Sequence, residues 1–352
     1  MQTLPPIGCH GRGAQASSLT NPVSHQEAPI TEQMRLVKEA GVFDFFDRQP
    51  LPQEAPEFVQ GASQYALPVW TGTWSYQLGR DDGALDRNAK AAKEVGMRMH
   101  NMMLFKQHAD GRLLTDEEVA GFYLRAYEIW QAQGIEISAE VHVNMWSEDF
   151  RRIAPVARAV QSRGIPFNFT LDYSHIIFKI GNAGEQAVSG IRDDVETGRL
   201  VLDPFEPGNL CEEWLSMGIV RWLQVRGVAP NGPRNLWSKV DPAIPNPGVI
   251  DDHPRAGEYG RGILYPFSRP RPGEWHSEWF AYKLELAKEV VRKVLLSHRK
   301  NADSGLSFIT TEMINLPDYG DGARFSLIGH NAEIARYVRR IWSEQHAPEF
   351  PI

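Results

Sequence analysis

The sequence has few cysteines, no long apolar run and no excess of basic residues. Its 352 residues include only two cysteines, Cys9 and Cys211, which are too few for a disulfide framework and suggest free thiols in a reducing compartment. No apolar stretch approaches the roughly 20 residues that span a membrane. The first residues lack the basic segment and apolar core of a secretory signal. The formal net charge of -7 argues against general nucleic-acid binding. We therefore expect a cytoplasmic protein without a membrane or nucleic-acid partner.

Three motifs of common enzyme classes are also missing. The sequence contains no Gly-x-Gly-x-x-Gly after an apolar run and no Walker lysine motif, so nicotinamide and ATP are poor candidates for cofactors. A Gly-x-Ser-x-Gly nucleophile elbow is absent too, which argues against an α/β-hydrolase.

Short apolar runs alternate with amphipathic stretches along most of the chain. This alternation predicts parallel strands joined by helical crossovers, and a length of 352 residues is normal for one α/β barrel. We therefore predict a single (β/α)8 TIM barrel domain over residues 1–352. The runs expected to form strands are 6–9, 42–46, 67–74, 97–104, 135–143, 167–171, 219–225 and 306–312. The stretches expected to form helices are 31–40 with Thr31 as its N-cap, 85–94, 115–133 with Thr115 at its start, 149–163, 278–297 and 331–344.

Two segments interrupt the alternation. Residues 180–218 follow the sixth run, and we expect one or two short helices there. Residues 230–275 are rich in Pro, Gly, Arg and Trp and form a long loop after the seventh strand. Long loops inside compact domains are usually functional or disordered, so we expect this one to cover the active site.

Three carboxylates lie at or just beyond the ends of different apolar runs. They are Glu140, Asp172 and Glu312, and His175 follows Asp172 by three residues. The C-terminal ends of barrel strands form the active face of this fold, and a buried carboxylate is costly unless it is paired or bound to a metal. For each carboxylate alone, a salt bridge to a neighbouring arginine is an alternative, and His175 alone could be a hydrogen-bonded loop residue. Together they predict a metal or acid–base site.

Other side chains near the run ends are candidates for the same site. His142 lies two residues after Glu140 and shares its face in a strand, so it is either a base near the site or a histidine in the core. Trp74, with Trp70 and Trp146, could form a wall for a sugar ring or could belong to the core. Candidates for contacts with substrate hydroxyl or carboxylate groups are His10, Arg12, His100, Arg226, Arg255 and Arg261.

The segments AEVH (139–142), LDYSH (171–175) and TTEMI (310–314) resemble those of the xylose-isomerase-like TIM barrels. That superfamily includes divalent-metal sugar isomerases, ketose 3-epimerases, inosose dehydratases and endonuclease-IV-type nucleases. In it, a Glu, the Asp of Asp-x-x-His, a His on the seventh strand and a Glu on the eighth hold the metal. The resemblance therefore implies Glu140, Asp172 and Glu312 as metal ligands, and it implies that His175 faces the substrate.

The seventh strand departs from this pattern. It reads VRWLQVRG, with Gln224 where the resemblance implies a histidine. A glutamine oxygen can bind Mg²⁺ or Mn²⁺ but disfavours zinc. We therefore expect a divalent metal held by Glu140, Asp172, Gln224 and Glu312. Mn²⁺ or Mg²⁺ is the expected ion, with Co²⁺ and Zn²⁺ as alternatives, and His253 is the alternative fourth ligand.

The resemblance implies a divalent-metal-dependent sugar or keto-sugar isomerase or epimerase. It would abstract a proton through a metal-stabilised enediolate, with Glu140, His142 or Glu312 as catalytic groups. The residues expected to bind the substrate are His175, Arg226, Trp74 and His10. One alternative is a lyase that eliminates from a 3-keto-glycoside or dehydrates a keto-polyol. A second is a non-catalytic metal- or sugar-binding barrel subunit. A nuclease is disfavoured by the charge and by the missing histidine, and a homo-oligomer is compatible with all of these.

Overall fold

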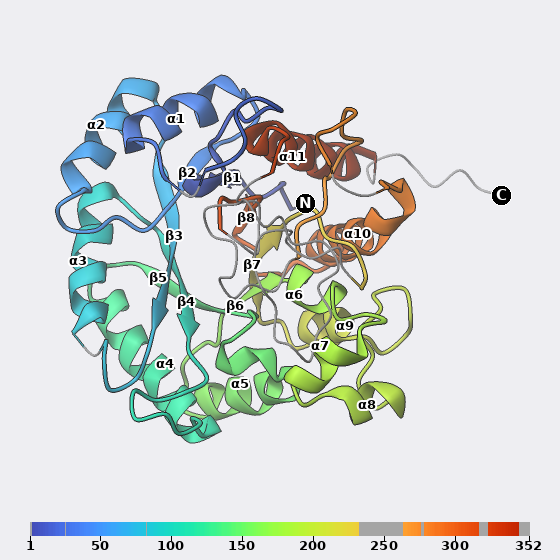
Figure 1. Cartoon of the computed structure of the whole chain (residues 1–352). Coiled ribbons are helices and arrows are strands. Elements are labelled where there is room, and N and C mark those ends of the chain that lie inside the picture. Colours follow the sequence, from blue (N-terminus) through green and yellow to red (C-terminus); the bar gives the residue numbers. More distant parts are fainter. Residues whose placement is uncertain are drawn as a thin grey trace.

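Eight parallel strands close into a barrel in the computed structural model, which describes residues 2–24, 26–81, 83–231, 263–275, 278–316 and 323–344. Each strand pairs with the next along the chain, and β8 closes the ring by pairing with β1. Figure 1 shows the barrel at the centre with helices around it. The prediction of a (β/α)8 barrel is confirmed. The strands are β1 (Ile7–His10), β2 (Phe45–Asp47), β3 (Val69–Tyr76), β4 (Met99–Leu104), β5 (Glu136–Glu140), β6 (Phe169–Asp172), β7 (Val220–Val225) and β8 (Phe308–Thr311).

The main helices connect successive strands, except that α11 follows the last strand, β8. They are α1 (Ile30–Glu39), α2 (Ala55–Tyr65), α3 (Ala84–Val95), α4 (Asp116–Gln131), α5 (Ile153–Gln161), α10 (Glu285–Lys300) and α11 (Leu327–Glu344). Four short helices lie between β6 and β7: α6 (Ser174–Ile177), α7 (Ala183–Val188), α8 (Arg192–Glu196) and α9 (Leu210–Ser216). Residues 180–218 thus hold three short helices, where one or two were predicted.

The capping chemistry of α4 shows how local sequence positions the strands. Thr115 accepts a hydrogen bond from the Glu118 amide at 3.2 Å, and the Glu118 carboxylate accepts one from the Thr115 amide at 2.9 Å. This capping box satisfies amide groups that the first turn leaves without partners. After the helix, Gly134 has a φ of +72°, which suits glycine and turns the chain into β5.

Two details of the helices differ from the prediction. Thr31 is not an N-cap: it lies inside α1, and the N-cap position belongs to Pro29. Helix α2 was not predicted, because its sequence has few large apolar residues and contains Gly61. A Cβ on Gly61 would lie 2.6 Å from the Met34 sulfur, so the glycine allows α2 to approach α1 closely.

The interior of the barrel changes character from one end to the other. At the N-terminal end of the strands, Phe45, Met99, Trp222 and Phe308 form a buried cluster with Trp70 packed against it. Residues two apart on a strand face the same side. On β7 and β8 the inward positions therefore change from aromatic side chains to polar and then charged ones.

Residues 263–275 pack back against the chain that follows β7. The Tyr265 amide donates to the Gly227 carbonyl at 2.9 Å, and the Phe267 amide donates to His330 Nδ1 at 3.0 Å. The rest of the predicted loop, residues 232–262, lies outside the described residues, and so does the predicted cover over the barrel mouth. Among the helices that the structure describes, none has the length and apolar character needed to cross a membrane.

Candidate active site

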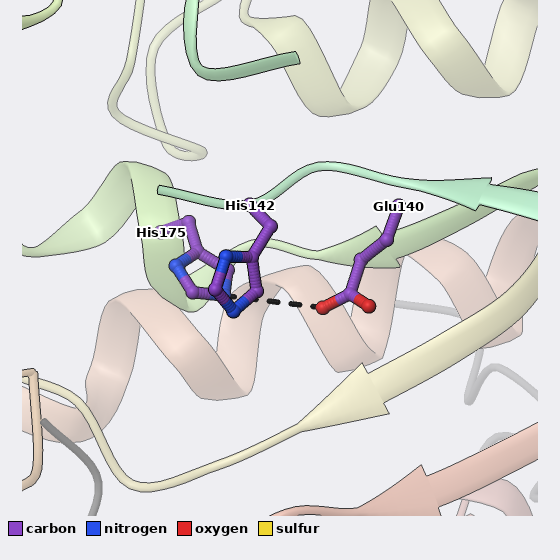
Figure 2. A group of neighbouring side chains, drawn as sticks. All are labelled: Glu140, His142 and His175. Carbon is purple, nitrogen blue, oxygen red and sulfur yellow. Dashed lines mark ion pairs between the residues drawn. The ribbon is translucent and has the colours of Figure 1, made fainter. Parts of the chain in front are cut away.

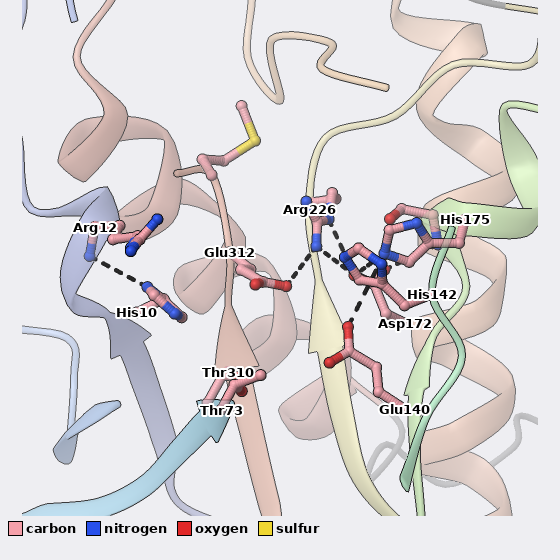
Figure 3. Close-up of polar contacts among 12 residues, drawn as sticks. His10, Arg12, Thr73, Glu140, His142, Asp172, His175, Arg226, Thr310 and Glu312 are labelled. Carbon is pink, nitrogen blue, oxygen red and sulfur yellow. Dashed lines mark hydrogen bonds and ion pairs between the residues drawn. The ribbon is translucent and has the colours of Figure 1, made fainter. Parts of the chain in front are cut away.

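The C-terminal ends of four neighbouring strands bring a cluster of charged side chains together. Glu140 ends β5, Asp172 ends β6, Arg226 follows β7 and Glu312 follows β8 (Figure 3). Carboxylate oxygens of Glu140, Asp172 and Glu312 lie within 4.8 Å of one another. The three carboxylates singled out in the sequence therefore meet at one place, inside the mouth of the barrel.

The Arg226 guanidinium lies between two of these carboxylates. Its Nη2 is 2.5 Å from Asp172 Oδ2 and 2.5 Å from Glu312 Oε2, and its Nε donates to Asp172 Oδ2 at 3.1 Å. Arg226 is only 3% exposed. The sequence suggested Arg226 as a substrate contact but did not indicate this double ion pair. The only available signal was its position two residues after Gln224, on the same face of the strand.

Two histidines lie beside Glu140 in Figure 2, and their hydrogen bonds indicate their tautomers. His142 Nδ1 lies 2.6 Å from the Val143 carbonyl oxygen, so Nδ1 donates and Nε2 carries the lone pair. His175 Nδ1 accepts from the Val143 amide at 3.5 Å, which leaves the proton on Nε2. That Nε2 lies 3.3 Å from Asp172 Oδ2 and 4.0 Å from Glu140 Oε1. His142 is suited to accept a proton and His175 to donate a hydrogen bond.

Glu140 is held on one side only. The Asn101 side chain donates to its Oε2, whereas its Oε1 has no hydrogen-bond partner among the described residues. The residue is 1% exposed. Asn101 was missed in the sequence, although a polar residue in the middle of an apolar run was a usable signal. The Ser147 hydroxyl donates to the Glu140 carbonyl at 2.5 Å and accepts from the His142 amide at 3.2 Å, which fixes the turn between the two site residues.

Burial and mutual repulsion divide the three carboxylates into different protonation states. Burial, with the charges of Glu312 and Asp172, raises the pKa of Glu140 well above its usual value. Burial also raises the pKa of Glu312 to about 8, although Arg226 opposes the rise. For Asp172, burial favours the neutral form, but Arg226 and His175 outweigh it and hold the pKa below its usual value. Asp172 is thus the ionised partner of Arg226, whereas burial favours the protonated form of Glu140 and, against the effect of Arg226, of Glu312.

The two histidines are neutral for a related reason. Burial lowers the pKa of His142 well below its usual value, and the neighbouring His175 lowers it further. Burial likewise lowers the pKa of His175, against the pull of Asp172. Burial thus favours a neutral imidazole beside carboxyl groups in their protonated form, an arrangement that general acid–base chemistry can use.

The described residues contain two sets of donors of the types that divalent metals bind. One is Glu140, Asp172 and Glu312, and the other is Glu140, His142 and His175. In the first set, Arg226 already binds one oxygen of Asp172 and one of Glu312. In the second, His175 Nε2 carries a proton and lies 3.3 Å from Asp172 Oδ2. The donor types fit a metal, but their arrangement is that of an arginine–carboxylate cluster.

Gln224 does not join this cluster through a hydrogen bond. It pairs in register with Asp172 on one side and Thr310 on the other. Its two amide atoms are buried and have no hydrogen-bond partner in the described part of the chain. His253, the alternative fourth ligand, and the candidate contacts Arg255 and Arg261 all lie outside the described residues.

The remaining predicted contacts divide into one at the mouth and others away from it. His10 lies across the mouth from His175 (Figure 3), is 8% exposed, and its Nδ1 accepts from the Arg12 amide at 3.2 Å. Trp74 pairs with Met102 and packs into the core between barrel and helices. His100 stacks on Trp130 in the same layer, with ring centroids 3.8 Å apart. Trp74 and His100 are therefore not brought to the site.

Comparison with solved structures places this architecture among known proteins, although no family model and no curated protein matches the sequence. A xylose isomerase-like TIM barrel protein from Mycobacterium smegmatis, solved in complex with magnesium, has a TM-score of 0.54 at 12% identity. The match covers 97% of this chain and 100% of that one. D-allulose 3-epimerase from Methylomonas sp. has a TM-score of 0.52 at 11% identity over 95% and 98%. The probable 3-DHS dehydratase AsbF from Bacillus anthracis, involved in petrobactin synthesis, has a TM-score of 0.51 at 11% identity over 94% and 98%.

These likenesses extend over nearly the whole length of every chain compared. At identities of 11% to 12% they concern the path of the backbone and not the residues of the site. The chain therefore has the fold of the xylose-isomerase-like TIM barrels, as its sequence segments suggested.

Proposed function

We propose that this protein is an isomerase or epimerase that moves a proton at a carbon next to the carbonyl group of a sugar or keto-sugar. The observation that carries the proposal is the pairing of a neutral imidazole, His142, with the buried carboxylic acid of Glu140. The partly buried His142 adjoins the mouth, and its Nε2 carries the lone pair that accepts a proton. The structures that share the fold include a sugar epimerase and a probable dehydratase, which supports a proposal of this reaction type.

The residues suggest a division of roles in the proton transfer. His142 Nε2 takes the proton as the C–H bond breaks, and the electron pair moves onto the carbonyl oxygen to form an enediolate. The His175 Nε2–H and the Arg226 guanidinium are the donors nearest the cluster that can hold this oxygen. Glu140 or Glu312 returns a proton to carbon, because burial favours the protonated form of both carboxyl groups. Proton transfer by a positioned group is typically worth roughly 10²- to 10⁴-fold in rate.

A lyase is the second candidate, and the same pair of groups favours it. Elimination from a keto-sugar needs a base to form the enolate and an acid to protonate the departing oxygen. His142 supplies the first, and Glu140 or Glu312 supplies the second. His10, on the opposite side of the mouth, is placed to contact a hydroxyl of either type of substrate.

The cation at the site is either a divalent metal ion or the guanidinium of Arg226. The resemblance implies a divalent metal bound by Glu140, Asp172 and Glu312, and we expected Gln224 as the fourth ligand with Mn²⁺ or Mg²⁺ as the ion. A divalent ion there would withdraw electrons from the carbonyl. The ion pairs of Arg226 compete with such binding, so no step of the proposed proton transfer is assigned to a metal.

Proton exchange in heavy water tests the proposal. The protein is incubated with a panel of keto-sugars in deuterium oxide, and deuterium at the carbon next to the carbonyl is followed by NMR. We expect incorporation by the wild-type protein and by the control His298→Gln, because His298 lies on α10, hydrogen-bonded to Ser304 and Thr3. The His142→Ala variant should be slower by roughly 10²- to 10⁴-fold. Conversion of a sugar without deuterium uptake, or equal exchange in His142→Ala, contradicts the proposal.

A further inference from the structure

We propose that the guanidinium of Arg226 is the resident cation of this site and takes the place of a divalent metal between Asp172 and Glu312. The active site would then stabilise the enediolate oxygen with a fixed side chain and would not require a metal ion. The catalytic role of Arg226 rests on the proposed function, but the claim about metal binding stands apart from it.

The first argument is that arginine and metal would compete for the same two carboxyl groups. Arg226 Nη2 lies 2.5 Å from Asp172 Oδ2 and 2.5 Å from Glu312 Oε2. Oxygen ligands bind Mg²⁺ at about 2.0–2.1 Å, and a slightly larger ion at somewhat longer distances. An ion held by these two oxygens would share them with a permanently charged nitrogen. Like charges that close repel strongly in a buried site, so binding one cation excludes the other.

The second argument is that the chain beside Arg226 is fixed in place. The next residue, Gly227, donates its amide to the Met313 sulfur at 3.2 Å and accepts the Tyr265 amide on its carbonyl at 2.9 Å. A Cβ on Gly227 would lie 2.0 Å from the Tyr265 carbonyl oxygen, so only glycine fits there. With its backbone held from both sides, Arg226 could release the carboxylates only by rotating its side chain. That rotation would leave Asp172 buried and ionised without its cationic partner, which is strongly unfavourable.

The third argument comes from Gln224. The resemblance implies a histidine ligand on the seventh strand, but this chain has a neutral amide at that position. An amide presents both a donor and an acceptor, and a cation could satisfy only the acceptor. The strand thus carries a neutral amide at one inward position and a fixed positive charge at the next.

Arginine also suits the proposed reaction. A guanidinium presents N–H donors in a planar fork that matches paired oxygens. Fixed donors directed at a developing oxyanion are a large source of rate enhancement, and removing one typically costs about 10²- to 10³-fold. Arg226→Lys keeps the charge and loses the fork, so it should retain more exchange activity than Arg226→Ala.

Metal binding by the whole protein, measured without any substrate, tests the inference. Protein produced in medium supplemented with manganese, magnesium, zinc and cobalt is dialysed and analysed for bound metal, and Mn²⁺ alone is titrated with detection by electron paramagnetic resonance. We expect the wild-type protein to hold no stoichiometric metal and to show no tight Mn²⁺ site. Removing the guanidinium in Arg226→Ala should raise Mn²⁺ affinity roughly 100-fold, the ratio that corresponds to a buried charge left unpaired. Asp172→Ala added to that variant should abolish the gain.

A matched control separates a site effect from a change of net charge. Arg152 pairs with Asp116 at 2.6 Å on the outside of the barrel, so Arg152→Ala removes the same charge and should create no Mn²⁺ site. About one equivalent of metal in the wild-type protein would overturn the inference, as would wild-type Mn²⁺ affinity equal to that of Arg226→Ala. The wild-type measurement decides even if Arg226→Ala does not fold. Metal-free protein without deuterium exchange would refute the proposed function alone, and metal-loaded protein with exchange would refute this inference alone.

Discussion

The two ends of the barrel interior are built by the same strands but contain opposite chemistry. At the N-terminal end, Trp222 of β7 and Phe308 of β8 pack in an aromatic cluster. Four residues further along each strand, Arg226 and Glu312 form an ion pair. The aromatic end closes the barrel and needs only shape and apolar surface. The charged end is buried at similar depth, so every group in it depends on its partners.

This difference separates a region that stabilises the fold from one that is arranged for chemistry. Apolar side chains gain stability from burial alone. A buried cluster of charges contributes little net stability, and replacing such a cluster with apolar residues is often neutral or stabilising. The presence of three carboxylates, two histidines and an arginine at one end is therefore better explained by function than by folding.

The largest expected effect comes from removing His142, the proposed catalytic base at the charged end. The His142→Ala variant should lose roughly 10²- to 10⁴-fold in the rate of proton exchange, because the imidazole that accepts the proton is removed. The free energy of unfolding should change little, since His142 is only partly buried. Exchange rates by NMR and urea denaturation measure the two quantities. A large loss of stability with near-normal exchange would place His142 in the fold and not in the chemistry. Metal lost from the variant, if the wild type contains any, would make His142 a ligand.

Breaking the aromatic end should have the opposite outcome. The Trp222→Ala variant removes a fully buried ring and the hydrogen bond from its Nε1 to Thr310 at 2.8 Å. We expect the free energy of unfolding to fall by about 3–5 kcal/mol, the usual range for such truncations. Trp222→Phe keeps most of the packing and should lose less. If Trp222→Ala slowed proton exchange as much as His142→Ala while remaining stable, the two ends would not be separate in function.

A smaller effect should appear at Asp47, which lies between the two ends. It is fully buried and accepts a hydrogen bond from Thr71 at 2.7 Å. Burial raises its pKa to about 7, although Thr71 and Arg48 oppose the rise. The unfolded chain loses this proton near pH 3.9, and the folded protein keeps it until about pH 7. Between these values the native state binds more protons, so stability should fall as pH rises.

The Asp47→Asn variant removes this contribution. Its free energy of unfolding should exceed that of the wild type by an amount on the order of 2 kcal/mol at pH 8, and by much less at pH 4. Urea denaturation over this pH range measures the difference between the two proteins. A difference in the free energy of unfolding that stays constant from pH 4 to pH 8 would show that Asp47 does not titrate in this range.

The sequence by itself determined the barrel and the identity of its three converging carboxylates. Alternation of apolar runs with helices specified eight parallel strands, and the C-terminal ends of such strands necessarily meet at one face. Glu140, Asp172 and Glu312 were recognisable because a carboxylate directly after an apolar run is exceptional in a buried strand. The start of α4 could also be predicted from the sequence, since the Thr115 capping box depends only on residues three apart.

Only the tertiary structure decided which neighbouring residues face inward and how the cluster is neutralised. Both faces of a barrel strand are buried, so apolar alternation does not reveal which face lines the interior. Thr73 faces the site, whereas the next residue, Trp74, packs into the outer core. In the same way, Asn101 faces the site and His100 packs outward against Trp130. The double ion pair of Arg226 is likewise absent from any local pattern, because its partners are 54 and 86 residues away in the chain. Contacts of that kind depend on barrel closure, which brings together the ends of strands that the sequence keeps apart.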